Sequence, residues 1–187
     1  MNLPNILTMS RIVMIPVFVA VFYLPMQWSY LVSALIFALA GLTDWLDGYL
    51  ARRLNQSTPF GAFLDPVADK LMVAVALAVL IEEYSAVLLT IPATVIIGRE
   101  IVISALREWM AEIGSRASVA VSYIGKIKTT AQMAAIVGLL AFPPGNVWAY
   151  VAIGLLYIAA ALTLWSMFLY LRAAWGDLFP KAEGGHS

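Results

Sequence analysis

Four aspartates, Asp44, Asp47, Asp65 and Asp69, lie close together in a chain that is otherwise mostly apolar. The first two are three residues apart and the last two are four apart, so each pair shares one face of an α-helix. Buried carboxylates need compensating charge, and oxygen ligands without histidine or cysteine suit Mg²⁺, Mn²⁺ or Ca²⁺. Four carboxylates on two facing helices could bracket two such ions about 4 Å apart, an arrangement used for phosphoryl transfer.

The same two predicted helix faces carry small residues and a cation. Gly48, Ala51 and Arg52 follow the second aspartate at helical spacing, and Gly61 precedes the third by one turn. A glycine lets a bulky ligand approach the backbone, and a guanidinium can fork onto a phosphate or a base edge. Small residues at this spacing also pack membrane helices, and one Asp–Arg pair can be structural or part of a proton path. Four aspartates at matching helical spacing with two glycines and an arginine favour a ligand site over a purely structural role.

The composition predicts a polytopic membrane protein. Hydrophobic residues make up 63% of the chain and charged residues 12%, whereas soluble domains are nearer half apolar and a quarter charged. The net charge is zero, so no nucleic-acid partner is expected. The absence of cysteine excludes a disulfide framework and a thiolate site, and the one histidine, His186, argues against a histidine-ligated zinc. No small-residue cleavage site follows the first apolar turn, so we expect the N-terminus to be retained.

Six segments approach the length of about 20 apolar residues that a transmembrane helix needs. They are 12–24 (lengthened by the amphipathic residues before it), 29–50, 61–81, 86–110, 119–142 and 147–171. We therefore expect an all-α bundle of six transmembrane helices over residues 1–175. A polar, flexible tail is expected over residues 176–187.

The basic residues predict the orientation of this bundle. With the N-terminus in the cytoplasm, the outer loops 25–28, 82–85 and 143–146 contain no lysine or arginine. All 11 basic residues then fall at or toward the cytoplasmic side, which is the positive-inside pattern. The four aspartates lie toward the same side, so we expect an active site that faces the cytoplasm.

The acidic motif resembles the signature of the CDP-alcohol phosphotransferase family at every position. The pattern in this chain is Asp44-x₂-Asp47-Gly48-x₂-Ala51-Arg52-x₈-Gly61-x₃-Asp65-x₃-Asp69. The segments NLPNILTMSR, GREIVISALREWM and GKIKTTAQM are similar to the branch of the family whose acceptor is glycerol 3-phosphate. The resemblance covers most of the chain up to about Phe142.

This resemblance implies a six-helix membrane enzyme, commonly a homodimer, in a bacterial inner membrane. The implied reaction transfers the phosphatidyl group of CDP-diacylglycerol to sn-glycerol 3-phosphate, giving phosphatidylglycerophosphate and CMP. The implied cofactors are two divalent cations, Mg²⁺ or Mn²⁺, held by Asp44, Asp47, Asp65 and Asp69. Asp69 would also be the general base.

The resemblance further implies two binding regions. The residues expected to contact the CDP moiety are Asn5, Thr8, Gly48, Arg52, Thr58 and Gly61. Because the acceptor is a dianion, its phosphate is expected to bind the cations Arg99, Arg107, Lys126 and Lys128. As an alternative, Arg107 and Arg116 could face phospholipid headgroups and pair with Glu100, Glu108 and Glu112.

Two other functions stay open from the sequence. The acceptor could be serine, an inositol phosphate or phosphatidylglycerol, since the aspartates do not discriminate among alcohols; the basic cluster favours a phosphorylated acceptor over serine. A cation or metabolite transporter could use the acidic cluster as an ion site. The position of all four aspartates toward one side of the bilayer favours the enzyme.

Overall fold

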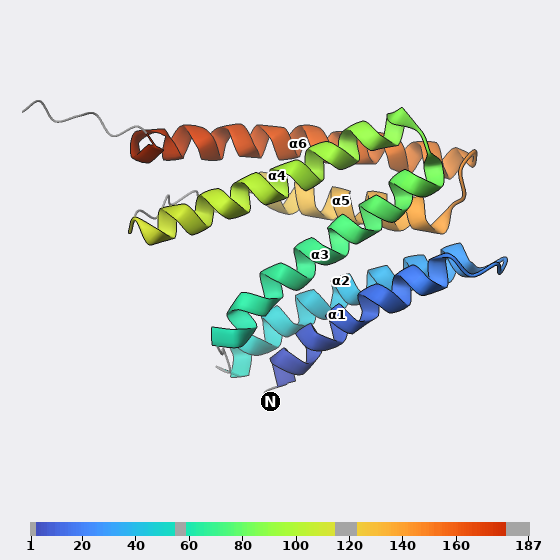
Figure 1. The fold of residues 1–187 in the computed structure, drawn as a ribbon, viewed down its shortest axis with the longest axis horizontal. Coiled ribbons are helices and arrows are strands. Elements are labelled where there is room, and N and C mark those ends of the chain that lie inside the picture. Colours follow the sequence, from blue (N-terminus) through green and yellow to red (C-terminus); the bar gives the residue numbers. More distant parts are fainter. Residues whose placement is uncertain (1–2, 55–58, 115–122, 179–187) are drawn as a thin grey trace, which may run out of the picture.

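The computed structural model describes residues 3–54, 59–114 and 123–178, and every regular element in these ranges is an α-helix (Figure 1). The helices are α1 (Leu3–Phe22), α2 (Ser29–Leu54), α3 (Pro59–Tyr84), α4 (Val87–Glu112), α5 (Tyr123–Ala141) and α6 (Val147–Leu178). Each predicted apolar segment therefore corresponds to one helix where it is described, and the prediction of an all-α protein with six helices is confirmed for the described ranges.

The helix boundaries follow from local signals. α2 begins at Ser29 and α6 begins at Val147, as predicted. α3 starts on Pro59, where the missing N–H costs nothing because the first helical N–H has no partner within the helix. α2 continues to Leu54, so its last turns still carry the first two aspartates of the motif. α6 continues to Leu178, and residues 179–187 of the predicted tail lie outside the described residues.

The helices alternate in direction, and their short connections gather at one end of the bundle. Segments 23–28, 85–86 and 142–146 all lie at the right in Figure 1. α1 packs on α2, while α4 and α5 both pack on α6. α3 runs diagonally between these groups and contacts both α1 and α4. This topology brings the start of α1, the start of α3 and the end of α4 toward the opposite end.

The hydrophobic core lies toward the end that carries the short connections. Phe18 and Phe37 are fully buried, and their ring centroids are 6.3 Å apart. Leu77, Leu139 and Leu156 extend the same buried cluster across α3, α5 and α6. Dense packing at this end holds the six helices together, whereas polar residues gather between them toward the other end.

Tyrosine hydroxyls form hydrogen bonds at the tightly packed end. The hydroxyl of Tyr84, at the end of α3, donates to the carbonyl oxygens of Phe142 (2.8 Å) and Leu139 (3.2 Å), which close α5. Burial raises the pKa of Tyr84 to about 12, so this hydroxyl stays protonated and remains a donor. Nearby, the hydroxyl of Tyr30 donates to the carboxylate of Glu83.

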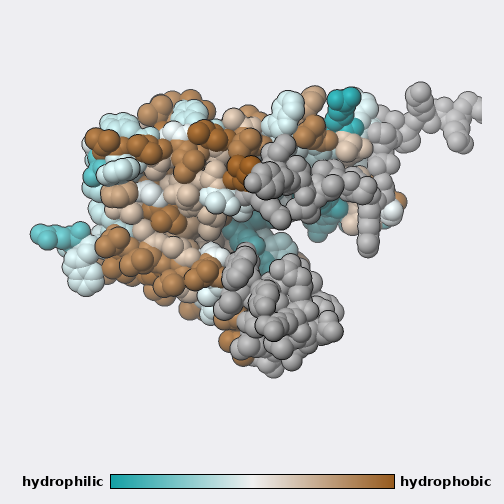
Figure 2. Space-filling view, turned by 180° about the vertical axis from the view of Figure 1, so that it is seen from behind, coloured by the Kyte–Doolittle hydropathy of each residue, from teal (hydrophilic) through white to brown (hydrophobic). Residues whose placement is uncertain are grey.

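On the face drawn in Figure 2, hydrophobic residues cover much of the described surface, with pale and hydrophilic residues between them. Large hydrophobic side chains point outward from several helices, among them Val13 (62% exposed), Ile101 (65%) and Val147 (73%). So many large apolar side chains turned outward are unusual for a protein surrounded by water. Because apolar residues occur on both the inner and outer sides of the same helices, the bundle has the character of a membrane protein.

Within the described ranges, two helices are long and apolar enough to cross a bilayer, Val87–Glu112 and Val147–Trp175. Ile6–Phe22, Ser29–Thr43 and Ile127–Ala141 are apolar but shorter. Charged residues interrupt the apolar run of α3, because Asp65, Asp69 and Lys70 occupy its first half. The two long helices indicate membrane association, and the crossing of all six remains a prediction.

Candidate active site

α1 and α3 are parallel neighbours whose side chains pair in register. Three hydrogen bonds connect residues at nearly constant sequence separation: Thr8 with Asp65, Arg11 with Asp69, and Tyr23 with Glu82. The first two place donors of α1 directly on two of the motif's carboxylates. The third, at 3.0 Å, lies at the opposite end of both helices and fixes their axial register.

Asp65 and Asp69 lie one turn apart on α3, and both turn a carboxylate oxygen toward α1. The hydroxyl of Thr8 donates to Oδ1 of Asp65, and Nη1 of Arg11 donates to Oδ1 of Asp69. The side chain of Arg11 is 1% exposed, whereas that of Asp69 is 44% exposed. A buried guanidinium needs such a carboxylate partner, and the exposed part of Asp69 remains accessible from a cavity.

Sequence reasoning missed the contact made by Arg11, which it counted only among the cations of the cytoplasmic side. The signal that could have found it is a lone arginine within an apolar helical run. A charge at such a position is costly unless it meets a partner inside the bundle. The partner is invisible in the sequence, because Asp69 is 58 residues away along the chain.

The remaining predicted ligands of the metals and the nucleotide are described only in part. α2 carries Asp44, Asp47, Gly48 and Arg52, whose side chains lie outside the described residues, as does the side chain of Asn5 on α1. Thr58 also lies outside them, whereas Gly61 is buried near the start of α3. Among the side chains that are described, no group of three or more His, Cys, Asp or Glu could hold a metal.

The described half of the acidic cluster nevertheless has the chemistry of a hard-ion site. Asp65 and Asp69 offer only oxygen donors, which Mg²⁺ and Mn²⁺ prefer. Their contacts with Thr8 and Arg11 each engage one carboxylate oxygen and hold the two carboxylates on one side of α3. The two residues therefore fit the predicted ions, and the grouping of all four aspartates stays a prediction.

Asp69 opens on a cavity of 980 Å³ to which all six helices contribute. Among the described residues, the charged side chains in its wall are five cations and two carboxylates: Arg11, Lys70, Arg99, Arg107, Lys128, Asp69 and Glu100. The rest of the wall is mostly apolar. The cavity therefore brings Asp69 together with Arg99, Arg107 and Lys128, three of the four predicted acceptor residues. The side chain of the fourth, Lys126, lies outside the described residues.

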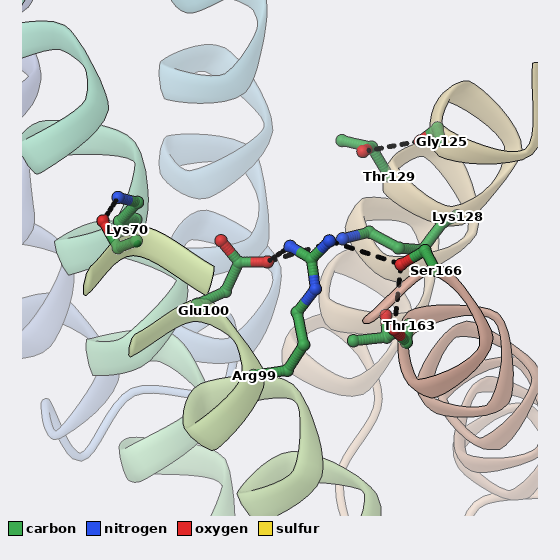
Figure 3. A network of polar contacts seen from close by, with 9 residues as sticks. Lys70, Arg99, Glu100, Gly125, Lys128, Thr129, Thr163 and Ser166 are labelled. Carbon is green, nitrogen blue, oxygen red and sulfur yellow. Dashed lines mark hydrogen bonds and ion pairs between the residues drawn. The ribbon is translucent and has the colours of Figure 1, made fainter. Parts of the chain in front are cut away.

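Glu100 connects two of these cations (Figure 3). Its Oε1 accepts from Nη1 of Arg99 at 2.8 Å and from Nζ of Lys128 at 3.4 Å. Nη2 of Arg99 also lies 3.3 Å from the hydroxyl of Ser166 on α6. In the described ranges the backbones of α4 and α5 do not pack against each other. The Glu100–Lys128 pair therefore bridges the cavity and holds two buried cations at one place.

Arg107 is held differently. Its guanidinium carbon lies 5.3 Å from the ring centroid of Tyr170 on α6, a cation–π contact. It forms no ion pair with any residue that the structure describes, and Glu100 pairs with Arg99 and Lys128 instead. The alternative in which Glu100 neutralises Arg107 is therefore wrong. Arg116 lies outside the described residues.

Arg99 and Gln132, both in the wall of this cavity, each carry a buried polar atom whose hydrogen-bonding capacity is unmet among the described residues. Nε of Arg99 and Oε1 of Gln132 have no hydrogen-bond partner in the described part of the chain. Buried polar atoms are almost always paired, and an unpaired one costs about 1–3 kcal/mol. Within the part of the chain that the structure describes, Nε of Arg99 is therefore a donor, and Oε1 of Gln132 an acceptor, that a ligand can use. Sequence reasoning missed Gln132, although it shares a helix face with Lys128, four residues earlier.

Lys70 is a further cavity residue that sequence reasoning left unassigned. Its ammonium donates to the hydroxyl of Ser104 on α4. It also lines a smaller cavity of 380 Å³, whose wall includes residues of α3 and α4. The position of Lys70 next to Asp69 in the sequence could have indicated that it lies in the same cavity. Lys70 adds positive charge beside Asp69 and ties α3 to α4.

Comparison with known proteins gives a family and close relatives. The profile of the family described as CDP-alcohol phosphatidyltransferase matches residues 1–165. A Salmonella typhimurium (strain LT2) protein named CDP-diacylglycerol–glycerol-3-phosphate 3-phosphatidyltransferase is 61% identical over 181 residues, covering 96% of this chain and 98% of that protein. Proteins of the same name from Escherichia coli (strain K12) and Shigella flexneri are 60% identical, with the same coverage.

Proposed function

The chain belongs to the CDP-alcohol phosphatidyltransferase family, and we propose that it transfers the phosphatidyl group of CDP-diacylglycerol to sn-glycerol 3-phosphate. The products are phosphatidylglycerophosphate and CMP. Relatives that are 60–61% identical carry names with the same two substrates. One structural observation carries the proposal: Asp69 and the cations Arg99, Arg107 and Lys128 line a single cavity. A phosphorylated alcohol needs a base for its hydroxyl and cations for its phosphate.

In the proposed reaction the acceptor's hydroxyl oxygen attacks the phosphorus that carries the diacylglycerol. The bond from this phosphorus to the oxygen shared with CMP breaks, and CMP leaves with the electron pair. Asp69 takes the proton of the attacking hydroxyl, a contribution typically worth about 10²–10⁴-fold in rate. The hydrogen bond from Arg11 to Oδ1 of Asp69 supports this role, because it orients the carboxylate.

The proposed metal site consists of Asp44, Asp47, Asp65 and Asp69, holding two divalent cations, Mg²⁺ or Mn²⁺. When bound, these ions would offset the negative charge of the pyrophosphate and of the leaving CMP. The support is the oxygen-only donor set and the common orientation of Asp65 and Asp69 toward α1.

The proposed CDP site consists of Asn5, Thr8, Gly48, Arg52, Thr58 and Gly61. Thr8 already donates to Asp65, so the N-terminal segment that would meet the nucleotide is joined to a proposed metal ligand. The acceptor's phosphate would bind Arg99, Arg107, Lys126 and Lys128. Substitution of an acceptor contact should raise the KM of glycerol 3-phosphate far more than that of CDP-diacylglycerol.

We also propose six membrane crossings in a bacterial inner membrane, with the N-terminus and the active site on the cytoplasmic side. The support is that segments 23–28, 85–86 and 142–146 share one end of the bundle and contain no lysine or arginine. Because the chain has no cysteine, Asn146→Cys and Arg172→Cys can each be labelled alone in intact cells. A membrane-impermeant maleimide should label the first and spare the second; the reverse pattern would contradict the orientation.

The assembly is proposed to be a homodimer, which cross-linking in native membranes would test. The activity is tested by incubating the purified protein with CDP-diacylglycerol, a divalent cation and one candidate alcohol, and measuring CMP. Glycerol 3-phosphate should support CMP release, whereas serine, an inositol phosphate and phosphatidylglycerol should not. Release with one of these alcohols in place of glycerol 3-phosphate would reassign the acceptor. Metal uptake into proteoliposomes without any CMP release would instead favour a transporter.

A further inference from the structure

Gln132 is a buried amide in the wall of the proposed acceptor cavity. It lies on α5, is 6% exposed, and its Oε1 has no hydrogen-bond partner among the described residues. Its neighbours Met133 and Ile136 on α5 pack in the hydrophobic core, so packing alone does not require an amide at this position. A buried acceptor without a partner is therefore a position where a ligand's donor can bind.

The place of Gln132 on α5 relates it to the proposed phosphate site. Lys128, which pairs with Glu100, lies four residues earlier on the same helix face. Four residues of α-helix rise by about 6 Å, which is comparable to the length of a three-carbon phosphate. Beyond Gln132, α5 enters the hydrophobic core at Ile136 and Leu139. Along this face, a cation is therefore followed by an amide and then by apolar packing.

The chemistry of an amide oxygen determines which part of the acceptor can bind there. A carboxamide oxygen only accepts hydrogen bonds, so it repels a phosphate dianion, which has no proton to donate. A hydroxyl can donate to it. The cations Arg99 and Lys128 attract the phosphate, so the two kinds of group orient an acceptor with its phosphate toward the cations and a hydroxyl toward Gln132.

We propose that Gln132 accepts a hydrogen bond from the middle hydroxyl of glycerol 3-phosphate, the one that does not react. Gln132 is thus a specificity-determining residue for the acceptor. This inference rests on the proposed function, because it names a substrate contact in the same site. A site in which a buried group pairs with a substrate hydroxyl discriminates against an analogue without that hydroxyl, because the buried group is then left unpaired.

The test compares glycerol 3-phosphate with 3-hydroxypropyl phosphate, which keeps the phosphate and the reacting hydroxyl but lacks the middle hydroxyl. We expect the wild-type protein to favour glycerol 3-phosphate by about 10- to 100-fold in kcat/KM. In Gln132→Met, which has a similar length but no amide, this preference should fall below about threefold. The KM of CDP-diacylglycerol should stay unchanged. Thr129→Val is a matched control, because the Thr129 hydroxyl already donates to the carbonyl of Gly125 at 3.0 Å; its preference should equal that of the wild type.

A second variant keeps the test decisive if Gln132→Met does not fold, as measured by its unfolding temperature. Gln132→Glu retains acceptor oxygens but adds a negative charge one turn from Lys128. It should keep the preference for glycerol 3-phosphate while raising the KM of both acceptors.

Two outcomes would overturn the inference. One is an unchanged preference in Gln132→Met, which includes an equal loss of rate on both acceptors, and the other is a lost preference in Gln132→Glu. Failure of the wild type to release CMP with either phosphate would instead refute the proposed function, on which the inference depends. The two failures are therefore distinguishable.

Discussion

Replacing Lys128 with methionine should weaken acceptor binding without unfolding the protein. Nζ of Lys128 lies 3.4 Å from Oε1 of Glu100, while Nη1 of Arg99 lies 2.8 Å from the same oxygen. After the substitution Glu100 keeps the shorter of its two ion pairs, so no carboxylate is left alone. Methionine also keeps most of the apolar stem of the lysine, whose side chain is only 10% exposed.

Lys128 has an ion pair with Glu100 and a proposed contact with the acceptor's phosphate, and losing them should have free-energy costs of different size. Its contact with Glu100 is longer than the usual range for a charge-assisted hydrogen bond, and Arg99 still compensates Glu100, so the free energy of unfolding should fall by about 1 kcal/mol. A direct hydrogen bond to the acceptor's phosphate would contribute about 1.5–3 kcal/mol. Since 1.4 kcal/mol corresponds to a factor of ten, the KM of glycerol 3-phosphate should rise about 10- to 100-fold. The KM of CDP-diacylglycerol should change less than about threefold.

Initial rates of CMP release, with one substrate varied and the other saturating, measure both constants. Arg172→Met is the matched control, because Arg172 is an exposed cation of α6 that does not line the cavity. It removes the same charge and should leave both KM values near those of the wild type. If Lys128→Met leaves the acceptor's KM unchanged, or raises both KM values equally, then Lys128 is only the counter-ion of Glu100 and does not bind the acceptor's phosphate.

Further substitutions test other parts of the structure. Asp69→Asn should lower kcat by about 10²–10⁴-fold and also lower the unfolding temperature, because the buried guanidinium of Arg11 loses this carboxylate; kcat near the wild-type value would exclude Asp69 as the base. Arg11→Met should lower the free energy of unfolding in a denaturant titration by about 1–3 kcal/mol, less than the 3–5 of a fully buried pair, since Asp69 is 44% exposed to water; no change would show that the pair is neutral. Tyr84→Phe should cost about 1–2 kcal/mol at pH 8. Because burial raises the pKa of Tyr84 from 10.0 to about 12, that stabilisation is complete below pH 10 and is lost as the pH rises toward 12. Thermal unfolding of the wild type and of Tyr84→Phe, at pH 8 and near pH 12, checks this. EDTA should abolish CMP release and Mg²⁺ or Mn²⁺ should restore it, whereas metal-independent release would contradict the proposed metal site.

The sequence predicted the parts of this protein that depend on local pattern. Six apolar segments interrupted by proline, glycine and charged residues became six helices. The spacing of Asp65 and Asp69 placed both on one side of α3, where Thr8 and Arg11 reach them. Periodicity along one helix decides such relations, because residues three or four apart share a face whatever the helix packs against.

The contacts between helices could not be read in the same way. Along α6, Leu156 is fully buried while Ile158 and Trp165 are more than half exposed, although all three are large and apolar. A helix that is apolar on every side carries no signal for which face points inward. The sequence therefore identified Arg99 and Lys128 as candidates but gave no indication that Glu100 pairs with both.

The sequence by itself determined the helices, the candidate residues of the acidic and basic clusters, and the relative placement of residues within each helix. Only the tertiary structure decided which helices are neighbours and how each is rotated about its axis. That choice buries Arg11 against Asp69, joins Glu100 to Lys128 across a cavity, and turns the amide of Gln132 into it. The physical reason is that rotation and neighbour choice minimise the packing and electrostatic free energy of all six helices together, which no single segment specifies.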